Sequence, residues 1–394
     1  MGLFNFNFSK KVDPVNPVSK LESDIMETIN MRNIDLPLPK EQKGQDWVLF
    51  GPNHQFPRDI VEYKRNSSIH ASIIESKASL ISGGGFIFTD TREESNRWLV
   101  DNWKLVPFWR KLDSVFRQVA SDQETFGYSC FEVIYSMDRT RIVDVNWLDA
   151  SRVAQGKRDE RGRINEYWYS ENWTNIRQYP PRRIGVWDPN KTDEFNQLVF
   201  ISYSENGMDY YSLPNYYSAM RWIKADYLMS EYNLAAINNG FSPSIVFKFF
   251  KKPTPEERRL NAEAIKSQHG GAKNAGKAII FYADGKDLAP EVQTLDATNI
   301  DQRLLQVAEA IIQNIITAHR AHPQLLGIQV PGKLGYSNEL LQSWEIFNNM
   351  VIKPERKLIL DAFREVLAYN GVIKCDIEPL VPIKIIQEDG NITN

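Results

Sequence analysis

Apolar residues recur every three or four positions in three long segments of the second half of the chain. The first segment covers residues 211–239, the second runs from Ile300 to Arg320, and the third opens at Ser337. Side chains at this spacing share one face of an α-helix, so the pattern predicts three long helices. A basic and polar segment separates the first two. This order indicates a stalk of two helices that carries a small insert at its tip.

The second of these helices has more apolar side chains than one buried face requires. The set includes Leu304, Leu305, Ile311, Ile312 and Ile315. Asn299, with Gln302 three residues later, fits an N-terminal capping box, and Pro323 marks the end of the helix. A stalk of two helices is too thin to bury both of its faces alone. We therefore expect neighbouring copies of the chain to cover the remaining apolar surface.

The first half of the chain mixes helical and strand patterns and predicts an α+β fold. Residues 47–61 have the pattern of a strand with loops, and Gly83–Gly85 fits a turn between a helix and a strand. Asp138 and Arg139 fit the turn of a hairpin. Helical spacing runs through Ser67–Leu80, Glu93–Trp103 and Trp109–Phe126, and strand patterns occupy Phe86–Phe88, Ser129–Ser136 and Ile142–Leu148.

The insert between the first two long helices has local signals of its own. Thr254, followed by Pro255 and two glutamates, is typical of a helix start with Thr254 as the N-cap. Residues 278–282 (AIIFY) predict a strand, and Gly271–Lys277 before it matches the G-x-x-x-x-G-K core of a phosphate-binding loop. Ala278, however, stands where a nucleotide site needs a hydroxyl residue, and a strand follows instead of a helix. A polar turn is the better interpretation.

Composition and charge fit a folded protein with no dominant polyanion-binding character. The chain has 394 residues, of which 42% are hydrophobic and 25% charged, and its formal net charge is -3. That length allows two or three domains. No apolar run reaches the roughly 18 residues that a membrane-spanning helix needs, so we expect no membrane partner. Cys130 and Cys375 lie far apart in sequence, which predicts buried thiols rather than a metal site.

Candidate catalytic and metal-binding residues are scarce. No nucleophile motif and no Cys/His cluster is present, and acidic pairs such as Glu256-Glu257 fit an exposed first helical turn. His319 and His322 lie three apart near a helix end and could hold a metal, but contact with the last helix carbonyls is the better interpretation. We expect no catalytic residues, no cofactor and no metal.

Several segments, in their order along the chain, resemble the portal proteins of tailed bacteriophages. The resemblance covers roughly residues 73–371, and its pieces are individually loose. Residues 122–138 (DQETFGYSCFEVIYSMD) with 143–153 resemble the wing sheet of that family, and 211–243 its first stem helix. Residues 271–277 resemble the turn of the family's clip. Residues 301–327, which end in HPQLLG, resemble its second stem helix and the exit from that helix. Residues 337–354 resemble the long helix that follows the tunnel loop.

The resemblance implies a division of the chain into eight parts. They are an N-terminal arm (1–45), a mixed α/β wing (46–210), stem helix 1 (211–241), a small α/β clip (242–296), stem helix 2 (297–321), a tunnel loop (322–336), a wing or channel helix (337–372) and a C-terminal strand and tail (373–394). Many members of the family end in a helical crown. Here only about twenty residues follow Gly371, so we expect the crown to be absent or vestigial.

The resemblance also implies function and partners. It predicts a homo-oligomeric ring, commonly of twelve copies, at one capsid vertex of the virion. The ring would be the channel for packaging and ejecting double-stranded DNA, assembled in the host cytoplasm. Its implied partners are terminase, the major capsid protein and head-to-tail adaptor or neck proteins. The alternatives are a nucleotide-dependent packaging enzyme that uses the Gly271 loop, or another head-to-tail connector ring.

The resemblance assigns two sets of site residues beside the stem-packing set. The tunnel loop, which would face DNA, contains Gly327, Gln329, Gly332, Lys333, Gly335 and Tyr336. A pore that lets DNA slide needs few phosphate contacts, and Lys333 is the one charge in the stretch 327–336. The clip would dock the packaging motor and neck proteins through Lys251, Lys252, Arg258, Arg259, Lys273 and Lys277.

Overall fold

The chain divides into two units, residues 1–36 and 37–394, and nearly all of the described residues belong to the second unit. The computed structural model describes residues 36–91, 107–191, 194–238, 246–249, 254–257, 259–260, 279–282, 297–323 and 337–380. Most of the predicted arm, the helix expected at Glu93–Trp103 and the tail after residue 380 therefore lie outside the described residues.

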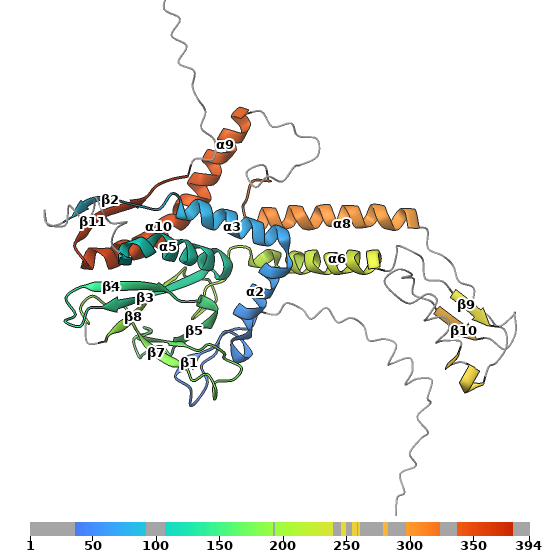
Figure 1. Ribbon diagram of the computed structural model, residues 1–394, viewed down its shortest axis with the longest axis horizontal. Helices are drawn as coiled ribbons and strands as arrows, with labels where there is room; N and C mark the ends of the chain where they lie inside the picture. The colour runs from blue at the N-terminus through green and yellow to red at the C-terminus, as the bar shows by residue number, and fades with distance from the viewer. Residues whose placement is uncertain are drawn as a thin grey trace, which may run out of the picture. The chain divides into compact units, whose positions relative to one another are not determined.

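A mixed sheet of seven strands occupies the first half of the chain, in the order β1-β5-β6-β7-β8-β3-β4 (Figure 1). Its strands are β1 (Trp47–Val48), β3 (Tyr128–Tyr135), β4 (Ile142–Trp147), β5 (Val153–Gly156), β6 (Glu166–Tyr169), β7 (Arg182–Val186) and β8 (Asn196–Ser202). Neighbours are antiparallel except β7 and β8, which run parallel. The predicted hairpin is confirmed, because Phe131 in β3 pairs with Trp147 in β4.

Helices from both ends of the chain build the core against this sheet. The helix α5 (Pro107–Phe126) contacts β3 and β4, while α3 (Ser68–Ser82) and α10 (Lys353–Tyr369) pack against α5. Phe363 of α10 is central, with its ring 4.3 Å from that of Phe131 and 5.2 Å from that of Phe116. Aromatic pairs at these separations add to the stability gained by burial. The predicted helices at Ser67–Leu80 and Trp109–Phe126 are confirmed.

A second, two-stranded sheet pairs β2 (Phe86–Thr91) with β11 (Val372–Ile377). The glycine turn before β2 is confirmed and makes close contact with the end of β11. Gly83 has φ +58°, and a Cβ atom on it would lie 2.1 Å from the carbonyl oxygen of Glu378. The Gly84 amide donates to that same carbonyl at 2.7 Å. Glycine is therefore required here both for its backbone conformation and for the close approach.

Two long helices, α6 (Met220–Asn238) and α8 (Ala297–Ala318), lie side by side (Figure 1). Between them in sequence, β9 (Val246–Phe249) and β10 (Ile279–Tyr282) pair in parallel. The predicted cap at Thr254 is confirmed as a capping box: the Glu257 amide donates to Thr254 Oγ1 at 3.3 Å, and the Thr254 amide donates to Glu257 Oε2 at 2.8 Å.

The third long helix is continuous but changes its winding. It consists of α9 (Ser337–Phe347), a π-helical turn η8 (Asn348–Ile352) and α10, and Pro354 stands in the first turn of α10. Proline has no amide hydrogen and its ring crowds the preceding turn. A wider π turn relieves that conflict. The π turn thus lies immediately before the turn that contains Pro354.

Two local expectations were wrong. Residues 47–61 contain, after β1, a 3₁₀ turn η1 (Pro52–His54) and most of the helix α2 (Gln55–Asn66), where loops were expected. Tertiary contacts hold this helix start: the Phe50 amide donates to His54 Nδ1 at 3.1 Å, and the Phe50 and Phe56 rings lie 4.3 Å apart. The helix α8 begins at Ala297, so Asn299 lies inside the helix and does not cap it.

Candidate functional site

The helix α8 buries one end against its own chain and exposes apolar side chains nearer its start. Ile311, Ile315 and Ile316 are buried in the single chain. By contrast, the Leu305 side chain is 66% exposed and Val307 is 46% exposed. Ile312 is partly buried, and the side chain of Leu304 lies outside the described part of the helix. The five predicted stem-packing residues therefore do not form one common surface.

The neighbouring helix α6 also exposes apolar side chains. Leu234 is 54% exposed, Leu228 is 43% exposed and Trp222 is partly exposed. Single exposed apolar residues are ordinary on protein surfaces, but a set of them on two paired helices points to contacts with other chains. Leu305 and Val307 are two positions apart and therefore lie on different sides of α8. We name the described residues Leu228, Leu234, Leu305 and Val307 the apolar stalk surface, which thus has more than one side.

The C-terminal end of α8 is anchored by a buried pair of histidines. His319 Nε2 lies 2.9 Å from His70 Nδ1 of α3, and both rings are buried. The ring of Tyr216 stacks on His319 at 4.7 Å and meets His70 edge-on at 4.4 Å. Burial lowers the pKa of His70 to about 3 and that of His319 well below its usual value, so both rings are neutral at physiological pH.

Buried charges tie the same region to the rest of the core. Lys77 of α3 and Glu124 of α5 form an ion pair whose side chains are almost completely buried. Glu355 of α10 accepts hydrogen bonds from the Tyr203 hydroxyl at 2.6 Å and from Asn215 Nδ2 at 2.8 Å. Burial raises the pKa of Glu124, while Lys77 acts in the opposite direction. A buried charge without its partner is strongly destabilising, so these pairs fix the relative positions of the helices.

His319 directly follows α8, so the histidine pair holds the chain end that leads into residues 324–336. Glu355 lies in α10, beyond α9 and the π turn, and holds that part of the third long helix to the body of the subunit. Arg356 adds to this second anchorage, because its Nε and guanidinium nitrogen donate to the carbonyls of Ile81 and Leu80 at 2.9 and 2.6 Å.

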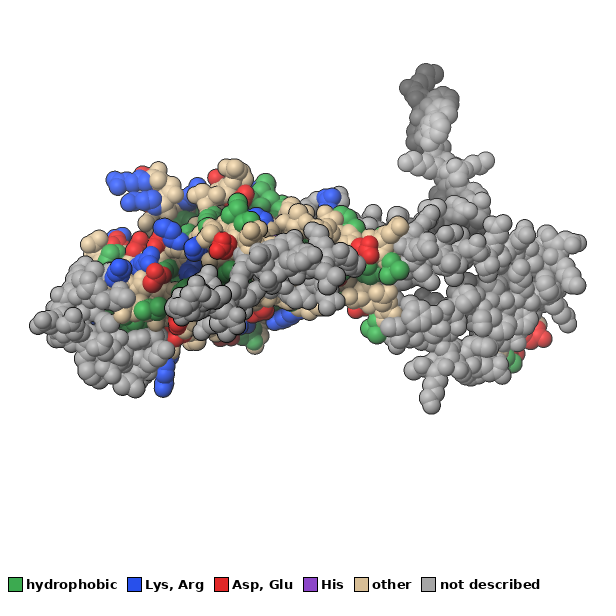
Figure 2. Space-filling view, turned by 90° about the horizontal axis from the view of Figure 1, so that it is seen from above, with side chains coloured by type: hydrophobic (Ala, Val, Ile, Leu, Met, Phe, Trp, Pro, Cys, Tyr) green, Lys and Arg blue, Asp and Glu red, His purple; other side chains and the backbone are tan. Residues whose placement is uncertain are grey.

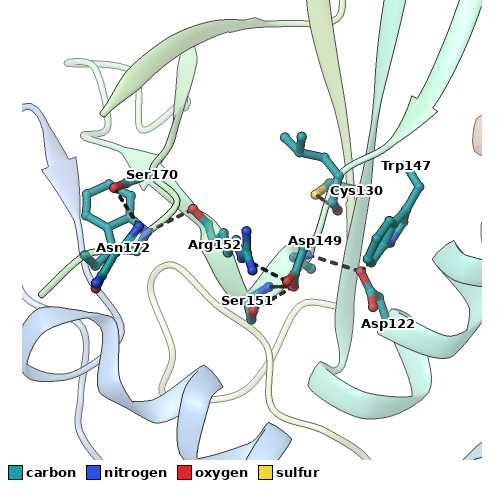
Figure 3. A network of polar contacts seen from close by, with 11 residues as sticks. Asp122, Cys130, Trp147, Asp149, Ser151, Arg152, Ser170 and Asn172 are labelled. Carbon is teal, nitrogen blue, oxygen red and sulfur yellow. Dashed lines mark hydrogen bonds and ion pairs between the residues drawn. The ribbon is translucent and has the colours of Figure 1, made fainter. Parts of the chain in front are cut away.

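A second polar network lies where β4 ends (Figure 3). Asp122 Oδ2 accepts a hydrogen bond from Trp147 Nε1 at 2.8 Å and one from the Ala150 amide at 3.2 Å. Asp149 Oδ1 in turn accepts from the amide of Ser151 at 3.0 Å. Burial and the nearby Asp149 raise the pKa of Asp122 to about 7. The network fixes the short 3₁₀ helix η4 (Ala150–Arg152) against the sheet.

The described surface carries mixed charges. On the face drawn in Figure 2, Lys and Arg side chains are interspersed with Asp and Glu, and hydrophobic side chains reach the surface between them. Among the described residues no three His, Cys, Asp or Glu side chains are grouped as a metal site. None of the helices in those ranges has both the length and the apolar character for crossing a membrane.

Most of the predicted site residues cannot be placed. All six tunnel-loop residues lie outside the described ranges, as do Lys251, Lys252, Arg258, Lys273 and Lys277 and the whole Gly271–Lys277 turn. Arg259 is described and exposed, in the helical stretch that Thr254 caps. Sequence reasoning missed His70, Lys77, Glu124 and Glu355, because single charged or imidazole side chains carry no periodic signal of burial.

A comparison with family models decides the classification. The model for "Phage portal protein" matches residues 112–379, more than half of the chain. The chain belongs to the phage portal protein family. As a portal protein it is a structural connector of a bacteriophage virion. The match includes α5, most of the large sheet, α6, α8 and the third long helix.

Solved structures agree on the fold of this portal protein. One similar chain comes from "Neck of empty GTA particle computed with C6 symmetry", with TM-score 0.55, 16% identity, and 82% of this chain and 85% of that chain covered. Another comes from "Neck of native GTA particle computed with C12 symmetry", with TM-score 0.50, 17% identity, and coverage of 83% and 86%. A search of curated protein sequences gave no match.

Proposed function

We propose that copies of this portal protein close into a ring in which the α6–α8 pairs of neighbouring subunits stand side by side as stems. The observation that carries the proposal is the apolar stalk surface, which a single subunit leaves in water. Burying a leucine side chain fully contributes about 1.5–3 kcal/mol, so repeated contacts of this kind favour association. Heterologous contacts related by rotation close into a ring. Similar chains come from necks computed with C6 and C12 symmetry, which supports twelve copies.

The two ends of α8 have separate tasks in this proposal. The buried end, with Ile311, Ile315 and His319, holds the helix to its own subunit. The exposed end, with Leu305 and Val307, meets the neighbour. This division means that a subunit can fold its body before the ring closes.

The ring would enclose a channel for double-stranded DNA, with residues 322–336 as the tunnel loop. The anchored end of α8 supports this role, because a loop facing a moving polymer needs a fixed attachment. Lys333 is the one charge in residues 327–336. Few phosphate contacts allow DNA to slide, whereas a strongly basic lining would hold it. Replacing Lys333 by Glu should impair DNA packaging or retention more than ring formation.

Residues 242–296 would form the clip that docks terminase during packaging and head-to-tail adaptor or neck proteins afterwards. The capped helical stretch 254–260 presents exposed side chains, among them Arg259. Lys251, Lys252, Arg258, Lys273 and Lys277 belong to the same proposed surface. The body of the subunit, residues 46–210 with 337–372, would be the wing that contacts the major capsid protein. This portal acts without catalysis, in the capsid vertex and, during assembly, in the host cytoplasm.

Electron micrographs of the purified full-length protein test the ring. The proposal expects closed rings with a central hole in end-on views. The variant Leu305→Glu should reduce the ring fraction strongly, because it places a charge in the proposed contact, while Gln306→Glu adds the same charge at an exposed polar neighbour. The proposal would be contradicted if the wild-type protein, Leu305→Glu and Gln306→Glu all appeared as single subunits at the same concentration.

A further inference from the structure

A cavity of about 360 Å³ opens between the helix α2, the 3₁₀ helix η4 and the segment after β6. Three arginines line it, namely Arg58 and Arg65 from α2 and Arg152 from η4, and Trp173 belongs to its wall. The volume falls at the lower end of the range for ligand-binding sites, roughly 300–1,000 Å³. No role in ring closure or in the DNA channel accounts for it.

The walls of this arginine cavity are held in place by hydrogen bonds. Trp173 Nε1 donates to the backbone carbonyl of Arg152 at 2.9 Å. The Asn172 amide donates to Ser170 Oγ at 3.2 Å, and the Ser170 amide donates to the Arg152 carbonyl at 3.2 Å (Figure 3). A site that is formed before its ligand arrives loses less entropy on binding.

The charges in the cavity are not balanced. Arg152 Nε lies 3.2 Å from Asp149 Oδ2, and Glu171 also acts electrostatically on Arg152. Within the described residues, neither Arg58 nor Arg65 forms an ion pair. Arg58 donates only to neutral groups, Gln55 Oε1 at 2.5 Å and the Asn53 carbonyl at 3.4 Å, and its buried Nε has no hydrogen-bond partner. Two guanidinium groups seven residues apart on α2 therefore line the cavity without an ion-pair partner among the described residues.

We propose that this cavity binds the carboxylate side chain of an acidic segment in a partner protein. Guanidinium groups bind carboxylates through paired, charge-assisted hydrogen bonds. Val61 and Trp173 supply apolar contact for the methylene groups of a glutamate. Nucleic acid is disfavoured, because Asp149 and Glu171 line the same cavity and repel a chain of phosphates.

Binding of short labelled peptides to the full-length protein at low salt tests this proposal. The probes are a fluorescein-labelled Gly-Glu-Glu-Gly peptide and its Gly-Gln-Gln-Gly counterpart, followed by fluorescence polarisation. The glutamate peptide should bind at least about fivefold more tightly, and Arg65→Gln should weaken it by a similar factor. Glu171→Gln should tighten binding, because it removes a repelling charge. Arg161→Gln, in an exposed turn outside the cavity, is the matched control and should change nothing.

Thermal melts of each variant show whether the fold is intact. Glu171→Gln is expected to tighten binding, and unfolding of the variant could not produce that result. Equal binding of the two peptides, or no effect of Arg65→Gln, would overturn the proposal. The proposal would also be overturned if inorganic phosphate or a short DNA duplex displaced the labelled peptide at a lower concentration than the unlabelled glutamate peptide does. Because the cavity and the apolar stalk surface share no residue, ring formation and this binding are tested by different variants.

Discussion

The imidazole rings of His70 and His319 meet through a 2.9 Å contact between Nδ1 of the first and Nε2 of the second, although 249 positions separate them. One ring must donate and the other accept, so the accepting ring must be neutral, and burial keeps both rings neutral. The pair joins α3 to the end of α8, so it links the body of the subunit to the proposed stem. Its other ring nitrogens, His70 Nε2 and His319 Nδ1, are buried without hydrogen-bond partners.

We predict that acid weakens this anchorage. The folded-state pKa values of both histidines lie below the ordinary value of about 6.5, which the unfolded chain retains. Their contribution is therefore complete above that value and is lost as pH falls below it. Between about pH 7.5 and pH 5 each histidine should cost about 2 kcal/mol of unfolding free energy. Denaturant unfolding at the two pH values measures the loss.

The variant His319→Gln separates this pair from other titrating groups. Glutamine can still form a hydrogen bond to His70 but does not titrate. The variant should lose less stability than the wild-type protein over the same pH interval. His54, whose pKa burial also lowers to about 3, remains in both proteins and cancels in the comparison. An identical pH dependence in the two proteins would show that the histidine pair is not responsible.

The buried ion pair of Lys77 and Glu124 gives a second prediction. Replacing Lys77 by Met leaves Glu124 buried without its cationic partner, so that it must either stay charged or take up a proton, at an expected cost of about 3–5 kcal/mol in unfolding free energy. Replacing both, with Glu124→Leu, should restore most of that loss. The exposed pair Lys357 and Asp361 is the matched control, and Lys357→Met should cost under about 0.5 kcal/mol. Chemical denaturation of the wild-type protein and the three variants measures these values.

Two glycines with positive φ angles provide a third prediction. Gly83 (φ +58°) touches the Glu378 carbonyl, whereas Gly162 (φ +76°) has nothing within 4 Å of an added Cβ. Gly162→Ala should cost about 1 kcal/mol through its backbone conformation alone. Gly83→Ala should cost at least about 2 kcal/mol more, because the β2–β11 pairing must shift. Melting temperatures of the two variants show the difference, and equal values would refute the close contact.

Sequence periodicity predicted those elements whose buried side chains recur at regular spacing within one short segment. The helix α5, the β3–β4 hairpin and α8 each have a regular apolar pattern, and each was found within a few residues of its predicted bounds. The glycine turn before β2 was also predictable, because three consecutive glycines indicate backbone conformations that other residues rarely adopt. The family resemblance, carried by the order of these segments, was confirmed by the family match.

What could not be predicted depends on partners distant in sequence. The helix α2 is an exception, because its start depends on contacts among Phe50, His54 and Phe56, which are near in sequence but belong to no regular apolar pattern. Lys77 and Glu124 look like surface charges in the sequence, because nothing local indicates a partner 47 positions away. His319 was expected to interact with helix carbonyls, and instead it pairs with His70. The tunnel-loop and clip residues remain predictions.

The central claim is that the apolar stalk surface of one subunit is covered by its neighbour in a closed ring. Mass measurement of the purified wild-type protein in solution, beside Leu305→Glu, tests it most directly. We predict one species with a mass many times that of the subunit for the wild-type protein, and folded single subunits for the variant. A stable wild-type single subunit, or a variant that forms the same large species, would contradict the account.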